Sequence, residues 1–313
     1  MKSFYIPRML VSVTLGLLSV PALAVISSDD RMLCPPVTGD SQAQNVHPTH
    51  APYKPVIAQG DGFSFTMTAV GIALPADFER QIEASARQIY NLWRDLLAEQ
   101  QLRPVQVQLL LLADPIDFDN SKQRLAPDLP VVSGFYSGRT NQAIVRYDAR
   151  QLQGSQRTAV HEISHLITSS QLGPADLWLA EGLAEYQETL QISGDKGIVA
   201  VNTRHLQWLK GAQLPVLAEF IDLPAADWDH ANIHRNYAVA WSLIYFLMNS
   251  EQGRQTLEVL LRHAAAHRCQ SYSTAALLDT AYIGGLQQLD ADWRVWLESP
   301  ALSQHEYGAR RGT

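Results

Sequence analysis

The sequence predicts an α+β protein, with a small sheet lobe first, a pair of buried helices next and a mostly helical second half. Before residue 150, short apolar and alternating runs are typical of strands. After it, apolar residues recur with the period of amphipathic helices up to residue 298. A run of strands followed by a run of helices favours the α+β class. The 46% of hydrophobic residues is ordinary for a globular protein.

Residues 1–24 have the three parts of a cleavable secretory signal peptide. Lys2 and Arg8 supply positive charge, residues 9–20 form a short apolar core, and Ala22-Leu23-Ala24 is a small-residue cleavage site. The apolar run is short for a membrane span, so cleavage is favoured, although an uncleaved anchor stays open. We therefore expect a periplasmic or secreted protein, with no membrane contact beyond export.

Residues 25–60 are rich in polar residues and proline, which predicts a poorly ordered leader. The two cysteines of the chain are Cys34, in this leader, and Cys269. In an oxidising compartment they could form a disulfide that ties the leader to the C-terminal helices. Two free thiols are the alternative. The folded domain is expected over residues 61–299, followed by a C-terminal tail, 300–313.

The first part of that domain supplies the predicted sheet lobe. Its expected elements are a strand at 63–70, an amphipathic helix at 75–100, a strand at 105–114, a polar connection at 115–130, and a hairpin of 131–136 with 142–147. The apolar half of the second strand predicts burial on both faces. One hairpin segment, 143–146 or 132–135, could lie at the sheet edge and pair with an extended peptide. An ordinary sheet strand is the alternative for each.

The segment His161-Glu162-Ile163-Ser164-His165 carries the strongest chemical signal in the chain. We expect a helix from an N-cap at Ser155 to a stop at Gly173-Pro174. Residues four apart share a helix face, so His161 and His165 can point at one ion. Glu162 can then reach a water on that ion as general base, which is the H-E-x-x-H arrangement of metalloproteases. The alternative is a helix that displays two surface histidines.

The next expected helix, 174–191, contains a candidate for the missing metal ligand. A catalytic zinc site needs three protein ligands, and the motif supplies two. Glu181 follows His165 after a turn, so an antiparallel helix could bring its carboxylate back to the ion. Glu185, one turn later, could accept a hydrogen bond from the outer N–H of His161 or His165. If Glu181 is not the ligand, Glu185 becomes the candidate.

The motif together with WLAEGLAEY, residues 178–186, resembles the gluzincin superfamily of zinc metallopeptidases, most closely its peptidase MA-like branch. The resemblance covers roughly residues 130–298 and implies a zincin-like sheet lobe. It further implies zinc on His161, His165 and Glu181, Glu162 as general base, and an outer acidic residue matching Glu185. Tyr237, in NYAVAWSLIYFL, matches a family tyrosine whose hydroxyl stabilises the tetrahedral oxyanion. A core tyrosine is the alternative for that position.

One departure from the family narrows the expected activity. Aminopeptidase-N-like enzymes carry a Gly-x-Met-Glu-Asn strand whose glutamate holds the free amine of the substrate. This chain has Gly134-Phe135-Tyr136-Ser137 there, without that glutamate. Endopeptidase action on a peptide or protein substrate is therefore expected rather than aminopeptidase action.

The remaining residues predict helices and exclude some partners. Amphipathic helices are expected at 238–248, 253–266, 274–282 and 286–297. A net charge of −7 argues against nucleic acid and anionic membranes as partners. Two other functions stay open: a zinc-stabilised binding or scaffold protein of the cell envelope without turnover, and a zinc hydrolase of a non-peptide amide. The sequence leaves the oligomeric state open.

Overall fold

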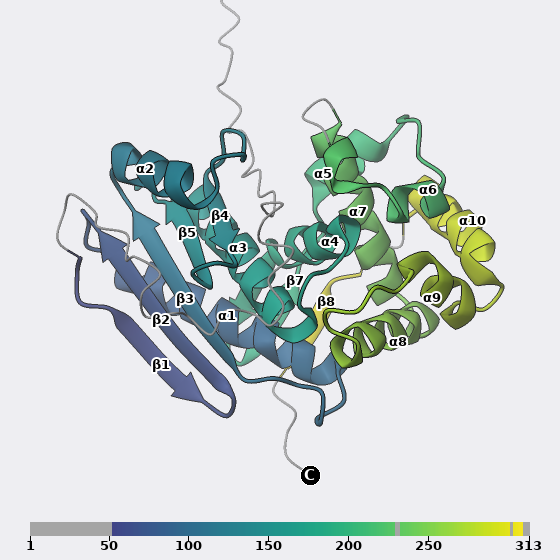
Figure 1. The fold of residues 1–313 in the computed structure, drawn as a ribbon, viewed down its shortest axis with the longest axis horizontal. Helices are drawn as coiled ribbons and strands as arrows, with labels where there is room; N and C mark the ends of the chain where they lie inside the picture. Colours follow the sequence, from purple (N-terminus) through teal and green to yellow (C-terminus); the bar gives the residue numbers. More distant parts are fainter. Residues whose placement is uncertain (1–51, 229–231, 301–302, 309–313) are drawn as a thin grey trace, which may run out of the picture.

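A five-stranded sheet forms the first half of the folded chain in the computed structural model, which describes residues 52–228, 232–300 and 303–308. Its strands are β1 (Val56–Gly60), β2 (Phe63–Val70), β3 (Val105–Leu112), β4 (Gly134–Ser137) and β5 (Gln142–Arg146). Their spatial order is β1-β2-β3-β5-β4 (Figure 1). The β2–β3 and β3–β5 pairs are parallel, and the outer pairs are antiparallel.

Helices bury the sheet and carry the chain from strand to strand. Helix α1 (Ala76–Leu96) links β2 to its parallel neighbour β3. Helix α3 (Leu152–Leu172) packs on β3, β4 and β5 and against α1. Leu109 to Leu112 of β3 are consecutively buried, so both faces of this strand are covered, as its unbroken apolar run predicts.

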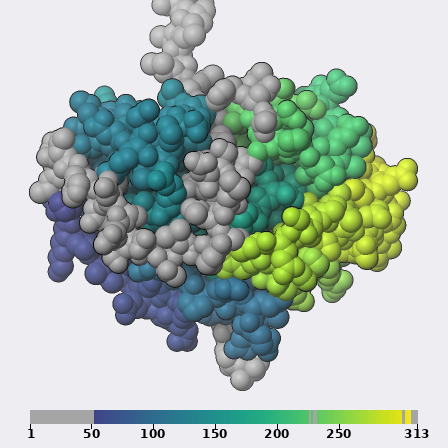
Figure 2. Space-filling view, viewed as in Figure 1, coloured from purple at the N-terminus to yellow at the C-terminus, as the bar shows by residue number. Residues whose placement is uncertain are grey.

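The second half is mostly helical, and the α+β prediction is confirmed. It contains α4 (Leu177–Gln187), α5 (Thr203–Leu209), α6 (Leu217–Ile221), a 3-10 turn η2 (Ala225–Asp227), α7 (Ile233–Met248), α8 (Glu251–Ala266), α9 (Thr274–Ala281) and α10 (Gly285–Glu298). A small antiparallel sheet joins β6 (Leu190–Ser193), β7 (Lys196–Val199) and β8 (His305–Gly308). In the space-filling view the N-terminal elements occupy one side and the C-terminal helices the other (Figure 2).

Three segments expected to lack regular structure form strands or helices. Strand β1 lies within the expected leader, so the fold begins before residue 61. Residues 115–125 of the expected connection form α2 (Pro115–Leu125), because Asp114 caps its first turn and Pro115 sits where a helix tolerates proline. The expected tail contributes β8, which pairs with β7 across more than a hundred residues of sequence.

Some expectations fall on parts of the chain that are not described. The predicted signal peptide, 1–24, and Cys34 lie outside the described residues, and so does the Cys34–Cys269 pairing. Among the helices of the described ranges, none has the length and apolarity required to cross a membrane.

Strand β8 gives a pH-dependent contribution to stability. His305 packs on the ring of Tyr245, and its Nδ1 lies 2.7 Å from the hydroxyl of Tyr186. Burial lowers the pKa of His305 to about 4 from its ordinary value of 6.5. The unfolded chain therefore binds this proton more readily, and stability is lost as the pH falls from about 6.5 to about 4. As the pH falls across that range, the melting temperature should decrease less steeply for His305→Gln than for the parent. Equal slopes would show that His305 does not carry this pH dependence.

Candidate metal centre

Helix α3 buries both histidines of the H-E-x-x-H segment. His161 and His165 are 0% and 2% exposed, which rules out the surface-histidine alternative. Their Nε2 atoms face each other at 3.0 Å, as expected for side chains one helical turn apart. The helix begins at Leu152, one turn before the expected start. Ser155 is therefore not its N-cap, and its hydroxyl accepts a hydrogen bond from the Asp148 amide instead.

The turn after α3 brings a carboxylate to these two imidazoles. Gly173 ends α3 with a positive φ of 74°, a conformation that favours glycine, and the chain reverses into α4. All eleven residues of α4 are buried, so Glu181 lies inside the protein and not on an exposed helix face. Glu181 Oε2 lies 3.5 Å from His161 Nε2 and 3.4 Å from His165 Nε2.

These three atoms form a triangle of the size that a zinc ion requires. Ligands at about 2.0–2.1 Å from a tetrahedral zinc lie about 3.3 Å from one another. The observed separations of 3.0, 3.4 and 3.5 Å match that value. Neither oxygen of Glu181 meets a hydrogen-bond donor within the described residues. A buried carboxylate without a donor is costly, and a cation held by His161, His165 and Glu181 would satisfy it.

The electrostatics of the site also favour positive charge. Burial alone would lower the pKa of His161, but its contact with Glu181 and the charges of Glu162 and Glu185 raise it to about 10. For Glu181, burial opposes the charged form, yet the two histidines hold the pKa of its carboxyl below the ordinary value. Acidic groups therefore surround the two histidines, and a bound metal ion would take the place of the protons that these groups otherwise hold on the imidazoles.

Glu162 lies beside this triangle and beneath strand β4. A Cβ added to Gly134 of β4 would come within 3.0 Å of Glu162 Cγ and 2.5 Å of Thr158 Cγ2, so only glycine allows this close passage of the strand. Burial, together with the Glu181 charge, raises the pKa of Glu162 to about 8. Its two oxygens have no well-aligned hydrogen-bond partner within the described residues. The carboxylate is therefore available to a small molecule such as water.

Tyr237 of α7 is buried near enough to the same centre to feel its charges. Its side chain is 2% exposed and packs on Trp228. Burial, and then the charges of Glu181 and Glu185, raise the pKa of Tyr237 well above its ordinary value. Its hydroxyl therefore keeps its proton and can act as a hydrogen-bond donor. The core-tyrosine alternative is correct about burial, but the side chain also lies within electrostatic reach of the acidic cluster.

A glycine in α4 allows α7 to come this close. A Cβ on Gly182 would lie 2.8 Å from the backbone oxygen of Ala240 and 2.8 Å from Ile244 Cγ1. Because a backbone carbonyl cannot rotate away, Gly182→Ala should push α7 from α4. We expect a loss of about 1–3 kcal/mol from overpacking, which outweighs the gain of helix propensity.

A matched variant makes this prediction specific. Gly154→Ala, in the first turn of α3, places its Cβ 3.7 Å from Gln151, an ordinary contact. It should stabilise the protein by up to about 1 kcal/mol through helix propensity alone. Urea unfolding of both variants measures the difference, and similar shifts for the two would refute the close-packing argument.

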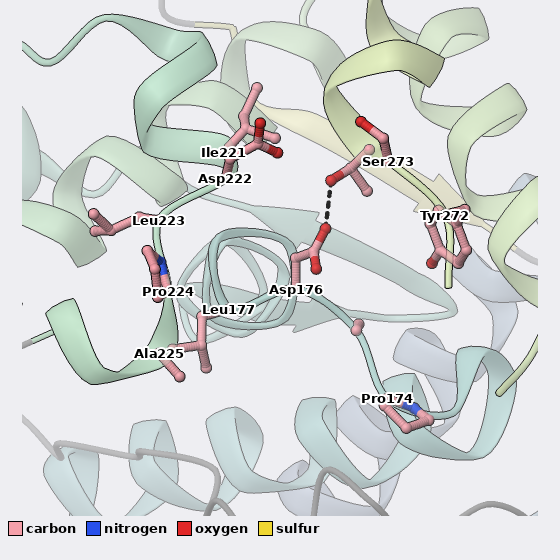
Figure 3. A pocket seen from close by; sticks show the side chains of 12 residues that line it. Pro174, Asp176, Leu177, Ile221, Asp222, Leu223, Pro224, Ala225, Tyr272 and Ser273 are labelled. Carbon is pink, nitrogen blue, oxygen red and sulfur yellow. Dashed lines mark hydrogen bonds between the residues drawn. The ribbon is translucent and has the colours of Figure 1, made fainter. Parts of the chain in front are cut away.

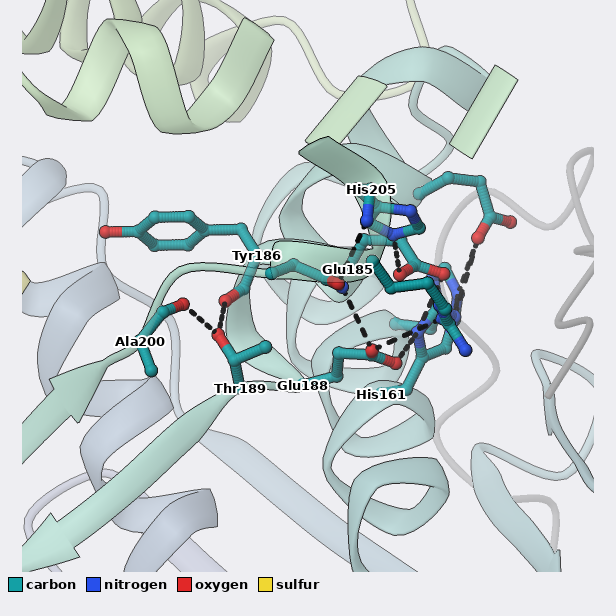
Figure 4. Close-up of polar contacts among 11 residues, drawn as sticks. His161, Glu185, Tyr186, Glu188, Thr189, Ala200 and His205 are labelled. Carbon is teal, nitrogen blue, oxygen red and sulfur yellow. Dashed lines mark hydrogen bonds and ion pairs between the residues drawn. The ribbon is translucent and has the colours of Figure 1, made fainter. Parts of the chain in front are cut away.

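Helix α5 contributes residues that the sequence reasoning missed (Figure 4). His205 Nε2 lies 2.6 Å from Glu185 Oε2, so Glu185 has this histidine as its nearest partner. Its other oxygen lies 3.9 Å from His161 Nδ1, longer than the expected hydrogen bond. His165 Nδ1 has no hydrogen-bond partner within the described residues. Glu188, at the end of α4, lies 3.8 Å from His161 Nδ1.

The surroundings shift the pKa values of the two outer carboxyl groups, Glu185 and Glu188, in opposite directions. Burial opposes charge on Glu185, but the neighbouring His205 lowers the pKa of that carboxyl below its usual range. Burial and the Glu185 charge raise the pKa of Glu188. Glu185 therefore bears the negative charge of the pair.

A separate pocket of about 370 Å³ lies beside the start of α4 (Figure 3). Asp176, the residue before α4, accepts a hydrogen bond from the Thr274 hydroxyl at the start of α9. The loop around Asp222 closes the other side. None of the predicted site residues lines this pocket.

The strand order decides between the two candidate edge segments. Strand β5, which contains 143–146, is enclosed between β3 and β4, so it cannot pair with an added peptide. Strand β4 lies at the end of the sheet and passes directly over Glu162. Of the two expected segments, the one leading into β4 is therefore the one at the sheet edge within the described residues.

Fold and site together define an α+β protein with a buried His–His–Glu cluster able to hold a metal ion. A family model described as "Protein of unknown function (DUF1570)" matches residues 155–269, the stretch that contains the cluster and Tyr237. A search of curated proteins finds no match.

Among solved structures, the chain is similar to the crystal structure of an M1 zinc metallopeptidase from Deinococcus radiodurans. The identity is 14% and the TM-score 0.40, and the alignment covers 81% of this chain and 52% of that one. The chain therefore spans about half the length of that enzyme.

Proposed function

We propose that this protein is a zinc-dependent hydrolase that cleaves peptide bonds within a chain, acting as an exported endopeptidase. The observation that supports it best is the triangle of His161 Nε2, His165 Nε2 and Glu181 Oε2 at 3.0–3.5 Å, with Glu162 beside it. These three residues would hold the ion. When bound, zinc supplies a Lewis acid that polarises a carbonyl and acidifies water.

The residues of the chain supply the remaining steps. Glu162 accepts a proton from the attacking water and returns it to the nitrogen of the departing amine. Tyr237 donates a hydrogen bond from its hydroxyl to the oxygen that becomes negative in the transition state. Strand β4, the last strand of the sheet within the described residues, would pair with the backbone of the substrate beside Glu162. The burial of these groups strengthens each interaction because little water screens it.

Export of the protein is a second part of the proposal and rests on the residue pattern of 1–24 alone. Separation of a periplasmic fraction, with N-terminal sequencing of the mature chain, tests it. A mature N-terminus at Val25 is expected. A protein that keeps Met1 and sediments with membranes would show the uncleaved anchor instead.

The metal ligands are tested by removing the carboxylate. Glu181→Ala should bind zinc at least about 10–100-fold more weakly than the parent, because the loss of a direct ligand exceeds that of an outer partner. Chelator competition on the purified mature chain measures the affinity. The exposed Glu251→Ala on α8 is the matched control and should leave it unchanged. Unaltered affinity in Glu181→Ala would move the ligand role to Glu185.

An unbiased peptide library separates the three candidate functions. Internal cleavage by the zinc-loaded parent, lost on chelation, is the expected result. Zinc binding without cleavage of any peptide would favour the scaffold function, and hydrolysis confined to non-peptide amides would favour the third alternative.

A further inference from the structure

A chain of buried polar contacts connects helix α5 to the metal triangle. His205, on the first turn of α5, is 4% exposed, and its Nε2 lies 2.6 Å from Glu185 Oε2. The second oxygen of Glu185 faces His161 Nδ1 at 3.9 Å. The Nε2 atom of that same imidazole lies 3.0 Å from His165 Nε2 and 3.5 Å from Glu181 Oε2.

The same turn of α5 also holds the second outer carboxylate. Asn202 donates a hydrogen bond to Glu188 Oε1 at 3.4 Å, and Arg204 lies 3.9 Å from the same oxygen. Asn202 Oδ1 in turn accepts from the backbone N–H of His205, which fixes the start of the helix. Helix α5 packs on α7, so the residues that contact Glu185 and Glu188 are attached to the helix that carries Tyr237.

We propose that His205 is a positioning residue of the metal centre, which holds Glu185 so that Glu185 orients the ligand His161. A short hydrogen bond between a charged carboxylate and an imidazole is stronger than a neutral one and fixes the carboxylate plane. The fixed oxygen attracts the proton of His161 to Nδ1, and Nε2 keeps its lone pair for the metal. Without His205 the Glu185 carboxylate can rotate, and Glu188 competes for His161 Nδ1 at 3.8 Å.

This inference rests on the metal site of the proposed function and is independent of peptide cleavage. The test is a double-mutant cycle on zinc affinity, measured by chelator competition with His205→Ala, Glu185→Ala and the double variant. We expect each single variant to weaken zinc binding by about 10–100-fold, as outer partners of metal-binding histidines do. Because His205 acts through Glu185, the double variant should bind zinc no more weakly than Glu185→Ala alone.

Two further variants separate positioning from folding. His205→Gln keeps an N–H donor near the Nε2 position and should recover most of the affinity that His205→Ala loses. His263→Ala, on α8, removes a histidine that stacks on His267 outside the cluster and should leave zinc affinity unchanged. In zinc-loaded protein the ¹H–¹⁵N resonance of His161 Nδ1–H should shift in His205→Ala and return in His205→Gln.

The outcomes distinguish the inference from the proposed function. Additive losses of zinc affinity in the cycle would overturn the positioning role. So would a His205→Ala variant that melts at a lower temperature but keeps its zinc affinity and its His161 resonance. If His205→Ala does not fold, a normal zinc affinity and His161 resonance in His205→Leu would overturn it equally. A non-additive cycle in a protein that cleaves no peptide would support the inference and refute the peptidase. A parent that binds no zinc would refute both.

Discussion

Glu162→Gln should retain the fold and the metal while its turnover falls about 10²–10⁴-fold, the usual contribution of a positioned general base. The amide has the shape of the carboxylate, so it fills the same space beneath Gly134. It cannot accept and return a proton. Steady-state cleavage of the best library peptide measures the loss, and chelator competition verifies that zinc affinity is preserved.

Two results would contradict the role of Glu162 as general base. If Glu162→Gln cleaves peptides at the parent rate, another group takes the proton. If the variant loses zinc as well as activity, Glu162 supports the metal site rather than the chemistry. Glu251→Ala, exposed on α8, controls for the loss of one acidic residue elsewhere in the chain.

Tyr237→Phe should lower kcat about 10²–10³-fold with nearly constant KM, as expected when a single oxyanion donor is removed. A hydroxyl that contacts only the developing negative charge stabilises the transition state and not the bound substrate. The phenylalanine ring keeps the packing against Trp228. Stopped-flow or steady-state kinetics, together with a thermal melt, separates the two effects.

Tyr245→Phe is the matched control because it changes the same residue type two turns later on α7. The hydroxyl of Tyr245 donates to the Ser303 backbone oxygen at 2.5 Å, away from the metal triangle. This variant should lose stability, by about 0.5–1.5 kcal/mol for one hydrogen bond, and keep its turnover. The reverse pattern, with Tyr237→Phe losing stability and keeping turnover, would make Tyr237 a core residue.

The predictions from sequence succeeded where the geometry is local. His161 and His165 meet because four residues make one helical turn, whatever surrounds the helix. The hairpin of β4 and β5 follows from alternating residues around Gly138 and Asn141, and Asn141 has the positive φ of 49° that such a turn uses. Glu181 was found by counting ligands, since two histidines are insufficient for a catalytic zinc.

They failed where a short segment depends on a distant partner. Strands β1 and β8 have five and four residues, too few for their alternation to stand out from a loop. Each is stabilised by pairing with a neighbouring strand, and β8 lies far from β7 in the sequence. Helix α2 is different, because Asp114-Pro115 is a local start signal that could have been recognised.

The amino-acid sequence by itself determined the α+β class and the residues that can bind a metal, because helical spacing and ligand chemistry are properties of neighbouring residues. The tertiary structure decided which strand lies at the sheet edge and which partner each acidic residue has. Glu185 was expected to accept a hydrogen bond from His161 or His165; it faces His161 Nδ1 at 3.9 Å, and its nearest partner is His205, twenty residues later on another helix. Such a contact depends on how α4, α5 and α7 pack, and packing is set by shape across the whole core.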